Sequence, residues 1–477
     1  MSDPTYTAPA MPYAAPGEAR THDPVAVAVG NASLLGVGYL LLRRYWFALA
    51  AVAGTVVLVS RLVSTSDAWY EVAVLVWWAA VIVHGWFLAR RSTGSGSTVR
   101  SQRLVALAVT MPVLLIVGVL RFDAARIQGS IAEARRNGDC TRVVSAQDQV
   151  WFGHRIADAP GTARGDDVVA VCDRLGTVTA QLSKGLTGDT RALKKGFGTL
   201  ASVLAQDGND RAVEATLNGF LDHLPVNDPC VTADVTGWLR NREPSHDLLD
   251  RSADTAARTA PAALVGCADD FMEHNNWEPA RDRYDELLQW YPGSDLADRA
   301  RRGTIKAALN IELVKVSGLL TAEAGEQPAY CSSPAKYSGA KPLGKGTNRA
   351  LFFGHDEYSI ASDYPKKFPS SWKAADASDA VLVVCMGEVT YGPSTQTCPY
   401  QAKSSGAVSN VTFHKIEVPV KVYELRTGKL VTSRKLQIGG TSCPSTVYAE
   451  EGSDPGPMYV RASASDVRAA FRPLVVR

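Results

Sequence analysis

The chain has no cysteine before Cys140, although eight occur in its 477 residues. No CxxC pair and no Cys/His pair at metal-ligand spacing is present, so a zinc site has no support and we expect no bound metal. An even number of cysteines confined to one part of a chain is typical of disulfides formed in an oxidising compartment. The sequence therefore predicts that the part from Cys140 onward is exported.

Net charge is also nearly absent: 50 basic and 48 acidic residues leave +2. No basic stripe with interleaved aromatic residues occurs, which argues against a nucleic-acid partner. No Gly-x-Ser-x-Gly segment supports an α/β-hydrolase nucleophile, and Glu273-His274 lacks the second histidine of a zinc-protease helix. We expect no catalytic residues and no cofactor.

One segment, Gly339–Thr347 (GAKPLGKGT), is similar to a phosphate-binding loop. Such a loop needs a strand before it and a helix after it, so that backbone N–H groups and the helix N-terminus hold the phosphate. Here a Pro/Ser-rich stretch precedes the segment, and Asn348–Phe353 has the pattern of a strand. We therefore expect no nucleotide partner.

Long apolar runs are present at 25–42, 45–63, 69–89 and 104–120, after a Pro/Ala/Thr-rich tail (1–24) that we expect to be disordered. Each run has about the length needed to cross a hydrocarbon core of roughly 30 Å. The first run lacks the basic start and cleavage site of a signal peptide. Residues 25–120 therefore predict a four-helix transmembrane region in the lipid bilayer, in which Asn31 and His84 are the candidates for intramembrane chemistry.

Arginines in the connections between runs set the predicted orientation. By the positive-inside rule these connections lie in the cytoplasm, and the acidic connection Ser64–Asp67 lies outside. An alternative has three helices, with 25–42 interfacial or re-entrant and the N-terminus inside. Both arrangements export the C-terminal part from the cytoplasmic membrane. The residues that set the topology are Arg43, Arg44, Arg90, Arg91, Arg100 and Arg103.

Residues 121–320 show helical periodicity with short Gly/Asn/Pro breaks, which predicts an extracytoplasmic all-α array. The turns between paired helices are expected at Gly138-Asp139, Gly208-Asn209 and Asn275-Asn276. Leu264–Pro292 resembles the tetratricopeptide repeat (TPR), in which two antiparallel helices carry small and large apolar residues at matching spacings. The residues that carry the resemblance are Leu264, Ala268, Phe271, Ala280, Tyr284, Leu287 and Pro292.

A second, weaker unit ends at Pro225, two steps of about 34 residues earlier, with a degenerate unit (Val226–Arg258) between the two. Its apolar positions are Ala201, Leu204, Ala212, Leu217 and Phe220. Cys267 replaces a large apolar residue of the repeat pattern, so the sequence does not define where each repeat begins and ends. A generic array of helical hairpins is the alternative to TPR units.

The last part begins with a Pro/Gly/Ser/Lys-rich linker (321–348) and continues as a small β-rich or α+β domain (349–477). We expect strands at Ala380–Thr390 and Val411–Leu425, the latter with a bulge near His414. A turn at Arg426–Lys429, a returning strand at Leu430–Ile438 and a helix at Ser465–Phe471 complete it. The phrases VVC (383–385), TCPY (397–400) and RTGK (426–429) resemble those at the ends of other exported bacterial proteins, which implies no activity.

Pairing of cysteines that are close in sequence is the simplest scheme for the disulfides. It predicts Cys140–Cys172, Cys230–Cys267 and Cys385–Cys398, with Cys331–Cys443 as the fourth bond. The first two would join neighbouring helices, and loops of this length contribute roughly 3 to 4 kcal/mol by chain-entropy estimates.

The function expected from these features is that of a membrane-anchored scaffold, which binds protein partners through TPR-like repeats in envelope assembly or secretion. One alternative is an envelope enzyme whose site in the C-terminal domain holds His355 or His414 beside an acid or a serine. Lys366, Lys367 and Trp372 are loop residues that could contact a glycan. A further alternative is an accessory or sensor subunit of a membrane complex.

Overall fold

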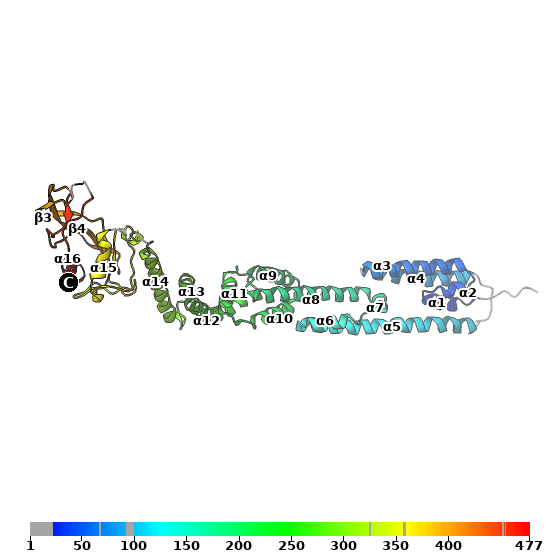
Figure 1. Cartoon of the computed structure of the whole chain (residues 1–477). Coiled ribbons are helices and arrows are strands. Elements are labelled where there is room, and N and C mark those ends of the chain that lie inside the picture. The colour runs from blue at the N-terminus through cyan, green and yellow to red at the C-terminus, as the bar shows by residue number, and fades with distance from the viewer. Residues whose placement is uncertain are drawn as a thin grey trace, which may run out of the picture. The chain divides into compact units, whose positions relative to one another are not determined.

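The computed structural model describes residues 22–65, 68–91, 100–323, 326–355, 359–403, 405–450, 453 and 455–477 (Figure 1). Most of the predicted tail, the end of the connection Ser64–Asp67 and the loop after Arg91 lie outside these residues. The chain forms two compact units. The first unit comprises Met1–Val226 and Asp234–Arg258, and the second comprises Asn227–Ala233 and Thr259–Arg477.

Among the described residues, three helices of the first unit are long and apolar enough to cross a membrane. They are α3 (Tyr45–Thr65), α4 (Ala68–Arg91) and α5 (Arg100–Asn137). They contain the predicted runs 45–63, 69–89 and 104–120. Helix α5 has 38 residues, so it continues well beyond the apolar run, as the pattern of Phe122–Arg136 predicts.

The predicted first span, 25–42, is not one helix. It forms α1 (Pro24–Ala32, nine residues) and α2 (Val37–Leu41, five residues). At 1.5 Å per residue α1 covers only about 14 Å, roughly half of a hydrocarbon core. The break has a local cause: Leu34 and Gly36 adopt positive φ angles of 60° and 69°. The four-helix expectation is therefore not met.

Both ends of this broken segment lie at the same end of the helix bundle. Asp23, the N-cap of α1, pairs with Arg103, and its backbone N–H donates to Gln102 Oε1 (3.2 Å). The carbonyl of Ala32, at the other end of α1, accepts from Trp78 Nε1 in the middle of α4 (2.9 Å). Helix α2 then leads back to Arg43, so the segment enters the bundle to about half its depth and returns.

The arginines that set the predicted topology gather at this end, which we call the arginine end. Helices α3 and α4 are antiparallel, because Thr55 contacts Trp77 while Phe47 contacts His84. Arg121 of α5 pairs with Glu71 of α4 at the opposite end (2.6 Å). Arg43 and Arg44 precede α3, Arg90 and Arg91 end α4, and Arg100 and Arg103 begin α5.

Beyond the apolar part, α5 becomes a core element of a helical array. Ile127, Ile131 and Ala134 of α5 pack with Val143 of α6 and Cys172 of α8. The following helices are α6 (Cys140–Gln147), α7 (Phe152–Ala157), α8 (Ala159–Gly185), α9 (Thr190–Leu204) and α10 (Asp210–Leu221). A single helix therefore joins the apolar bundle to the polar array without a linker.

The array continues with α11 (Pro229–Asn241), the 3-10 turn η1 (Leu248–Asp250), α12 (Arg251–Glu273), α13 (Trp277–Trp290) and α14 (Ala297–Leu320). In the second unit α12, α13 and the start of α14 share one core. The end of α14 lies in a different core, where Val316 and Leu320 pack on the C-terminal sheet. Helix α14 therefore connects the helices of this unit to its β-rich part.

The sheet is organised around β4 (Val408–Glu424), as the long alternating pattern predicts. β2 (Leu382–Met386) and β3 (Thr390–Gln401) follow each other along β4, and both are antiparallel to it. β5 (Lys429–Ile438) pairs with β4 as well, while β1 (Ala350–Phe353) and β6 (Met458–Tyr459) are parallel to β2 and β4. Register shifts lie opposite His414, where the bulge was predicted, but the extra residues are in β3 rather than in β4; Gly428 turns at φ 67°.

Alternation along the strands gives the sheet two covered faces. Leu382, Val384 and Met386 pack in one core with Phe471 of the terminal helix α16 (Ala464–Val475). Val383 and Cys385 point to the other face, toward α14. The short elements η2 (Ala329–Cys331), η3 (Ile360–Asp363), α15 (Tyr364–Lys367) and η4 (Ser370–Trp372) complete this part.

The predicted linker 321–348 is packed rather than free in its described residues. Tyr330 and Ala340 are fully buried, and Asn348 is 4% exposed. Cys331 is bonded to Cys385 of the sheet. The segment is therefore a covering layer of the C-terminal fold, and its Pro/Gly-rich composition gave no signal of this packing.

Four disulfides pair all eight cysteines. Cys140–Cys172 and Cys230–Cys267 are as predicted. The predicted Cys385–Cys398 and Cys331–Cys443 are wrong, because the bonds are Cys331–Cys385 and Cys398–Cys443. Cys385 lies opposite Lys421 and Cys398 opposite Val411, about 30 Å apart along β4. Bonded cysteines have Cα atoms less than about 7 Å apart, so these two cannot be joined.

Peptide mapping of the unreduced protein tests this connectivity. We expect linked peptides that contain Cys331 with Cys385 and Cys398 with Cys443, because strand register separates Cys385 from Cys398. Mass spectrometry with and without reduction identifies them. A Cys385–Cys398 peptide would mean that β2 and β3 do not follow each other along β4.

Candidate functional site

The broken segment brings the two predicted intramembrane residues close together. Asn31, fully buried, donates to the carbonyl of Val81 on α4 (3.2 Å). Tyr39 of α2 donates to the same carbonyl (3.2 Å) and lies 2.8 Å from Nδ1 of His84. A Cβ at Gly38 would lie 2.1 Å from the carbonyl of Val27, so only glycine lets α1 and α2 pack this closely. Polar contacts therefore hold the segment against α4.

The predicted repeat-packing residues largely share the core of α12, α13 and α14. Those buried in it are Leu264, Ala268, Ala280, Tyr284 and Leu287. Phe271 is partly buried against the same core, and Pro292 lies just beyond α13. Cys267, fully buried, bonds to Cys230 of α11.

Other parts of the array depart from a regular repeat. Ala201 is exposed, and Leu200 and Val203 are buried in its place. Residues 226–258, all described, form α11, η1 and only the first turns of α12. The degenerate unit therefore has one complete α-helix where a TPR unit has two.

The three predicted inter-helix turns lie where the sequence places them. Gly138, Gly208 and Asn275 have positive φ angles of 72°, 80° and 60° between successive helices. Arg135, near the end of α5, donates to Asn209 Oδ1 in the second of these turns (3.1 Å). This hydrogen bond ties α5 to the start of α10.

Helices of the second unit are also joined by a partly buried polar contact. Tyr284 of α13 donates to Asp269 Oδ1 of α12 (2.5 Å), and Arg299 of α14 pairs with the same carboxylate. Burial, and then the hydrogen bond to Asp269, raise the pKa of Tyr284. The phenol stays neutral and acts as a donor, which suits a packing role rather than acid–base chemistry.

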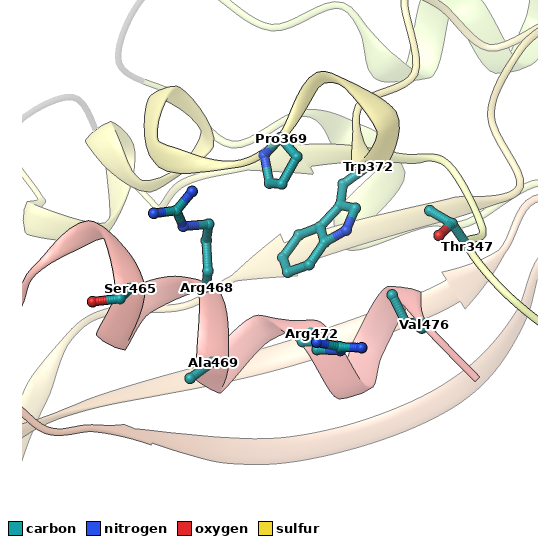
Figure 2. Close-up of a pocket in the computed structure, with 8 residues that line it drawn as sticks. All are labelled: Thr347, Pro369, Trp372, Ser465, Arg468, Ala469, Arg472 and Val476. Atoms are coloured by element: carbon teal, nitrogen blue, oxygen red, sulfur yellow. The ribbon is translucent and has the colours of Figure 1, made fainter.

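The C-terminal part contains an open pocket of about 690 Å³, shown in Figure 2. Helix α16 lies along one side, and the indole of Trp372 and the ring of Pro369 face it from the η4 segment. The complete lining is Thr347, Pro369, Trp372, Ser465, Arg468, Ala469, Arg472 and Val476. Trp372, singled out in the sequence as a glycan-contact candidate, therefore lies in a pocket.

Lys366 and Lys367 do not join Trp372 there. Lys366 pairs with Asp363 (2.6 Å), which raises the pKa of Lys366. Lys367 lies over the Tyr364 ring at 5.3 Å. Arg468 and Arg472 replace them as the cations of the pocket. Arg468 lies on the predicted terminal helix Ser465–Phe471, and Arg472 directly follows that range, although the observed helix includes it. Their spacing of four residues was the available signal, but nothing in the sequence places the helix beside Trp372.

The histidines of the alternative enzyme hypothesis do not line this pocket either. His414 Nδ1 lies 2.8 Å from the carbonyl of Gly392, and its ring contacts Tyr391. His355 is exposed, and its neighbour Asp356 lies outside the described residues. Among the described residues no group of three or more metal-ligand side chains comes together.

The segment similar to a phosphate-binding loop is a covering loop. Strand β1 follows it, not a helix. Gly344 N–H donates to Asn348 Oδ1 (2.9 Å), and Gly346 N–H to the carbonyl of Arg477 (2.9 Å). These backbone donors are already used, so this loop lacks the phosphate cradle of a P-loop.

Glu312 of α14 holds the covering layer in place. Its carboxylate accepts from Ser338 N–H (2.7 Å) and lies 3.1 Å from Lys336 Nζ. Burial alone would raise the pKa of Glu312, but the hydrogen bonds from Ser338 and Lys336 outweigh burial and hold it below its usual value. The ionised form therefore stabilises the fold above the ordinary glutamate pKa, and this contribution is lost as pH falls through the lowered pKa.

Replacing Glu312→Gln tests this contact. A hydrogen bond to a charged group contributes about 1.5 to 3 kcal/mol. The side chains of Glu312 and Lys336 are 23% and 64% exposed, and solvent screening reduces the contribution to about 1 to 2 kcal/mol, which corresponds to about 5- to 30-fold. We expect backbone amides of residues 336–340 to exchange about 5- to 30-fold faster at pH 7, and the ratio to wild type to fall toward one at acid pH. Hydrogen-exchange mass spectrometry measures both. Equal ratios at both pH values, or the same effect from Glu278→Gln on α13, would contradict the assignment.

No protein-family model, no curated protein and no solved structure matches the chain. The resemblance of Leu264–Pro292 to a TPR unit therefore stays a prediction, which depends on this chain's own residues.

Proposed function

We propose that this chain is an extracytoplasmic scaffold, anchored in the cytoplasmic membrane, that binds protein partners through its TPR-like helical array. The observation that carries the proposal is the continuity of α5, whose first half is an apolar helix and whose second half is a core element of the array. Such a helix fixes the array at the membrane surface. An array of helical hairpins offers an extended surface to partners.

The charge distribution supports export of the array. All six arginines that set the predicted topology lie at one end of the helix bundle, the arginine end, and the positive-inside rule assigns that end to the cytoplasm. With three spans the array then lies outside, and the segment 25–42 is re-entrant with the N-terminus inside. Four disulfides beyond the last span agree with an oxidising compartment.

Exposed aromatic residues near the opposite end also suit this placement. Trp151 and Phe152, 57% and 65% exposed, lie at the start of α7. His154 of the same helix is 3.1 Å from Asp123 of α5, just past the apolar run. Aromatic side chains at this depth are typical of a membrane interface.

A role as accessory subunit of a membrane complex is the second candidate. The specific observation in its favour is the re-entrant segment, since broken helices at membrane depth occur where protein buries them or where they line a cavity. Asn31 Oδ1 is buried and has no hydrogen-bond partner among the described residues. That atom is out of reach of a partner, but His84 of α4, beside Tyr39, is exposed and accessible to a partner inside the bilayer.

Site-specific photocrosslinking of the full-length protein in its native membrane tests both roles. Photoreactive residues at Lys194 of α9 and Asp285 of α13, both exposed, report on the array, and exposed Lys421 of β4 is the control. We expect adducts with a protein partner at one or both helical positions and none at Lys421. Adducts from His84 alone would favour the accessory role. Absence of adducts from the array, together with turnover of a substrate by the protein, would contradict the scaffold.

A further inference from the structure

We propose that the pocket between α16 and η4 binds an acidic saccharide, whose carboxylate or phosphate lies between Arg468 and Arg472 (Figure 2). The site is independent of the helical array. Its volume of about 690 Å³ is within the range of small-molecule pockets. One or two sugar rings are therefore a suitable size of ligand segment.

The polar groups of the pocket match an anion. Two guanidinium groups, the indole N–H of Trp372 and the hydroxyl of Thr347 can all donate hydrogen bonds, whereas the hydroxyl of Ser465 is used in a hydrogen bond with Ser463 (2.7 Å). No acidic residue lines the pocket. Among the described residues no carboxylate pairs with Arg468 or Arg472, whereas many other arginines of the chain have such a partner. The pocket is therefore rich in donors that an anion would satisfy.

The packing of α16 places both arginines on its exposed side. Val467 and Phe471 are fully buried in the core, which fixes the face that the helix turns outward. Arg468 and Arg472 are one turn apart on that outer side, and Arg468 Nε donates to the carbonyl of Ala464 (3.0 Å). Like charges at this spacing repel each other. A bound anion removes the repulsion, and guanidinium groups bind carboxylate or phosphate through paired hydrogen bonds.

Trp372 and Pro369 add an apolar wall, which favours a sugar ring over a free inorganic ion. Trp372 is 8% exposed and packs against Phe368 at 5.7 Å, so its ring is fixed and a small part of it faces the pocket. Within the described residues its N–H has no hydrogen-bond acceptor, and it is not closed off from the pocket. The indole therefore offers one donor and an apolar edge beside the arginines.

Binding of the full-length protein in detergent micelles to three immobilised polymers tests the site. The probes are polygalacturonate, which carries carboxylates, dextran phosphate, and neutral dextran. We expect binding to one or both charged polymers and none to neutral dextran. Binding to polygalacturonate alone identifies a carboxylate ligand, binding to dextran phosphate alone a phosphate ligand, and binding to both a site for either anion.

Matched variants separate the pocket from general charge attraction. The double variant Arg468→Gln and Arg472→Gln removes two charges from the pocket. The control Arg434→Gln and Lys403→Gln removes two exposed charges elsewhere in the same part. We expect at least tenfold weaker binding for the first and less than twofold for the second. Equal losses in both, or no binding of wild type to either charged polymer, would overturn the proposal.

A third variant addresses the indole. Trp372→Phe keeps an aromatic ring in the core but removes the N–H donor. We expect several-fold weaker binding, with the melting temperature measured alongside to show that the fold persists. If Trp372→Phe binds as wild type while the arginine pair is essential, Arg468 and Arg472 hold the anion without the tryptophan, and the assigned role of the indole is wrong.

Discussion

The structure of the first unit depends on a single helix, α5, whose two halves are suited to two different environments, hydrocarbon and water. Within the bundle α5 is apolar, and a helix makes most of its backbone hydrogen bonds internally, as a hydrocarbon environment requires; Pro112 removes one donor from this pattern. Further along, Ile127, Ile131 and Ala134 form an apolar stripe against α6 and α8, as water requires. Because α5 is continuous across both environments, the position of its apolar half fixes the position of the helices packed on its second half. The disulfide Cys140–Cys172 then fixes α6 to α8 beside it.

In the second unit α14 likewise joins two separate cores. Its start packs with α12 and α13, and its end packs on the sheet beside the Cys331–Cys385 bond. Glu312 lies between these two cores and holds the covering loop. Within each unit, shared helices therefore replace flexible linkers, as the proposed scaffold role requires.

Features set by neighbouring residues were predictable from the sequence, and features set by distant contacts were not. The turns at Gly138, Gly208 and Asn275, the position of the bulge near His414 and the hairpin at Gly428 follow from local backbone preferences. Hydropathy counts apolar residues but does not detect a break in a helix. The run 25–42 therefore had the hydropathy of a membrane-spanning helix, although the positive φ angles of Leu34 and Gly36 divide it into two short helices. The wrong disulfides have the same origin, because the distance between Cys385 and Cys398 depends on their register with β4. Trp372 was a candidate contact residue, but no pocket was predicted, because Arg468 and Arg472 reach it through the packing of α16.

The central claim is that the arginine end faces the cytoplasm and the cysteine-bearing array lies outside. Labelling of introduced cysteines in intact protoplasts with a membrane-impermeant maleimide tests it most directly. Thr65→Cys lies at the far end of α3, and Ser101→Cys lies in the first turn of α5 at the arginine end; both positions are exposed. The account predicts that Thr65→Cys is labelled in intact protoplasts and that Ser101→Cys is labelled only after lysis. Labelling of Ser101→Cys in intact protoplasts, with protection of Thr65→Cys, would contradict it.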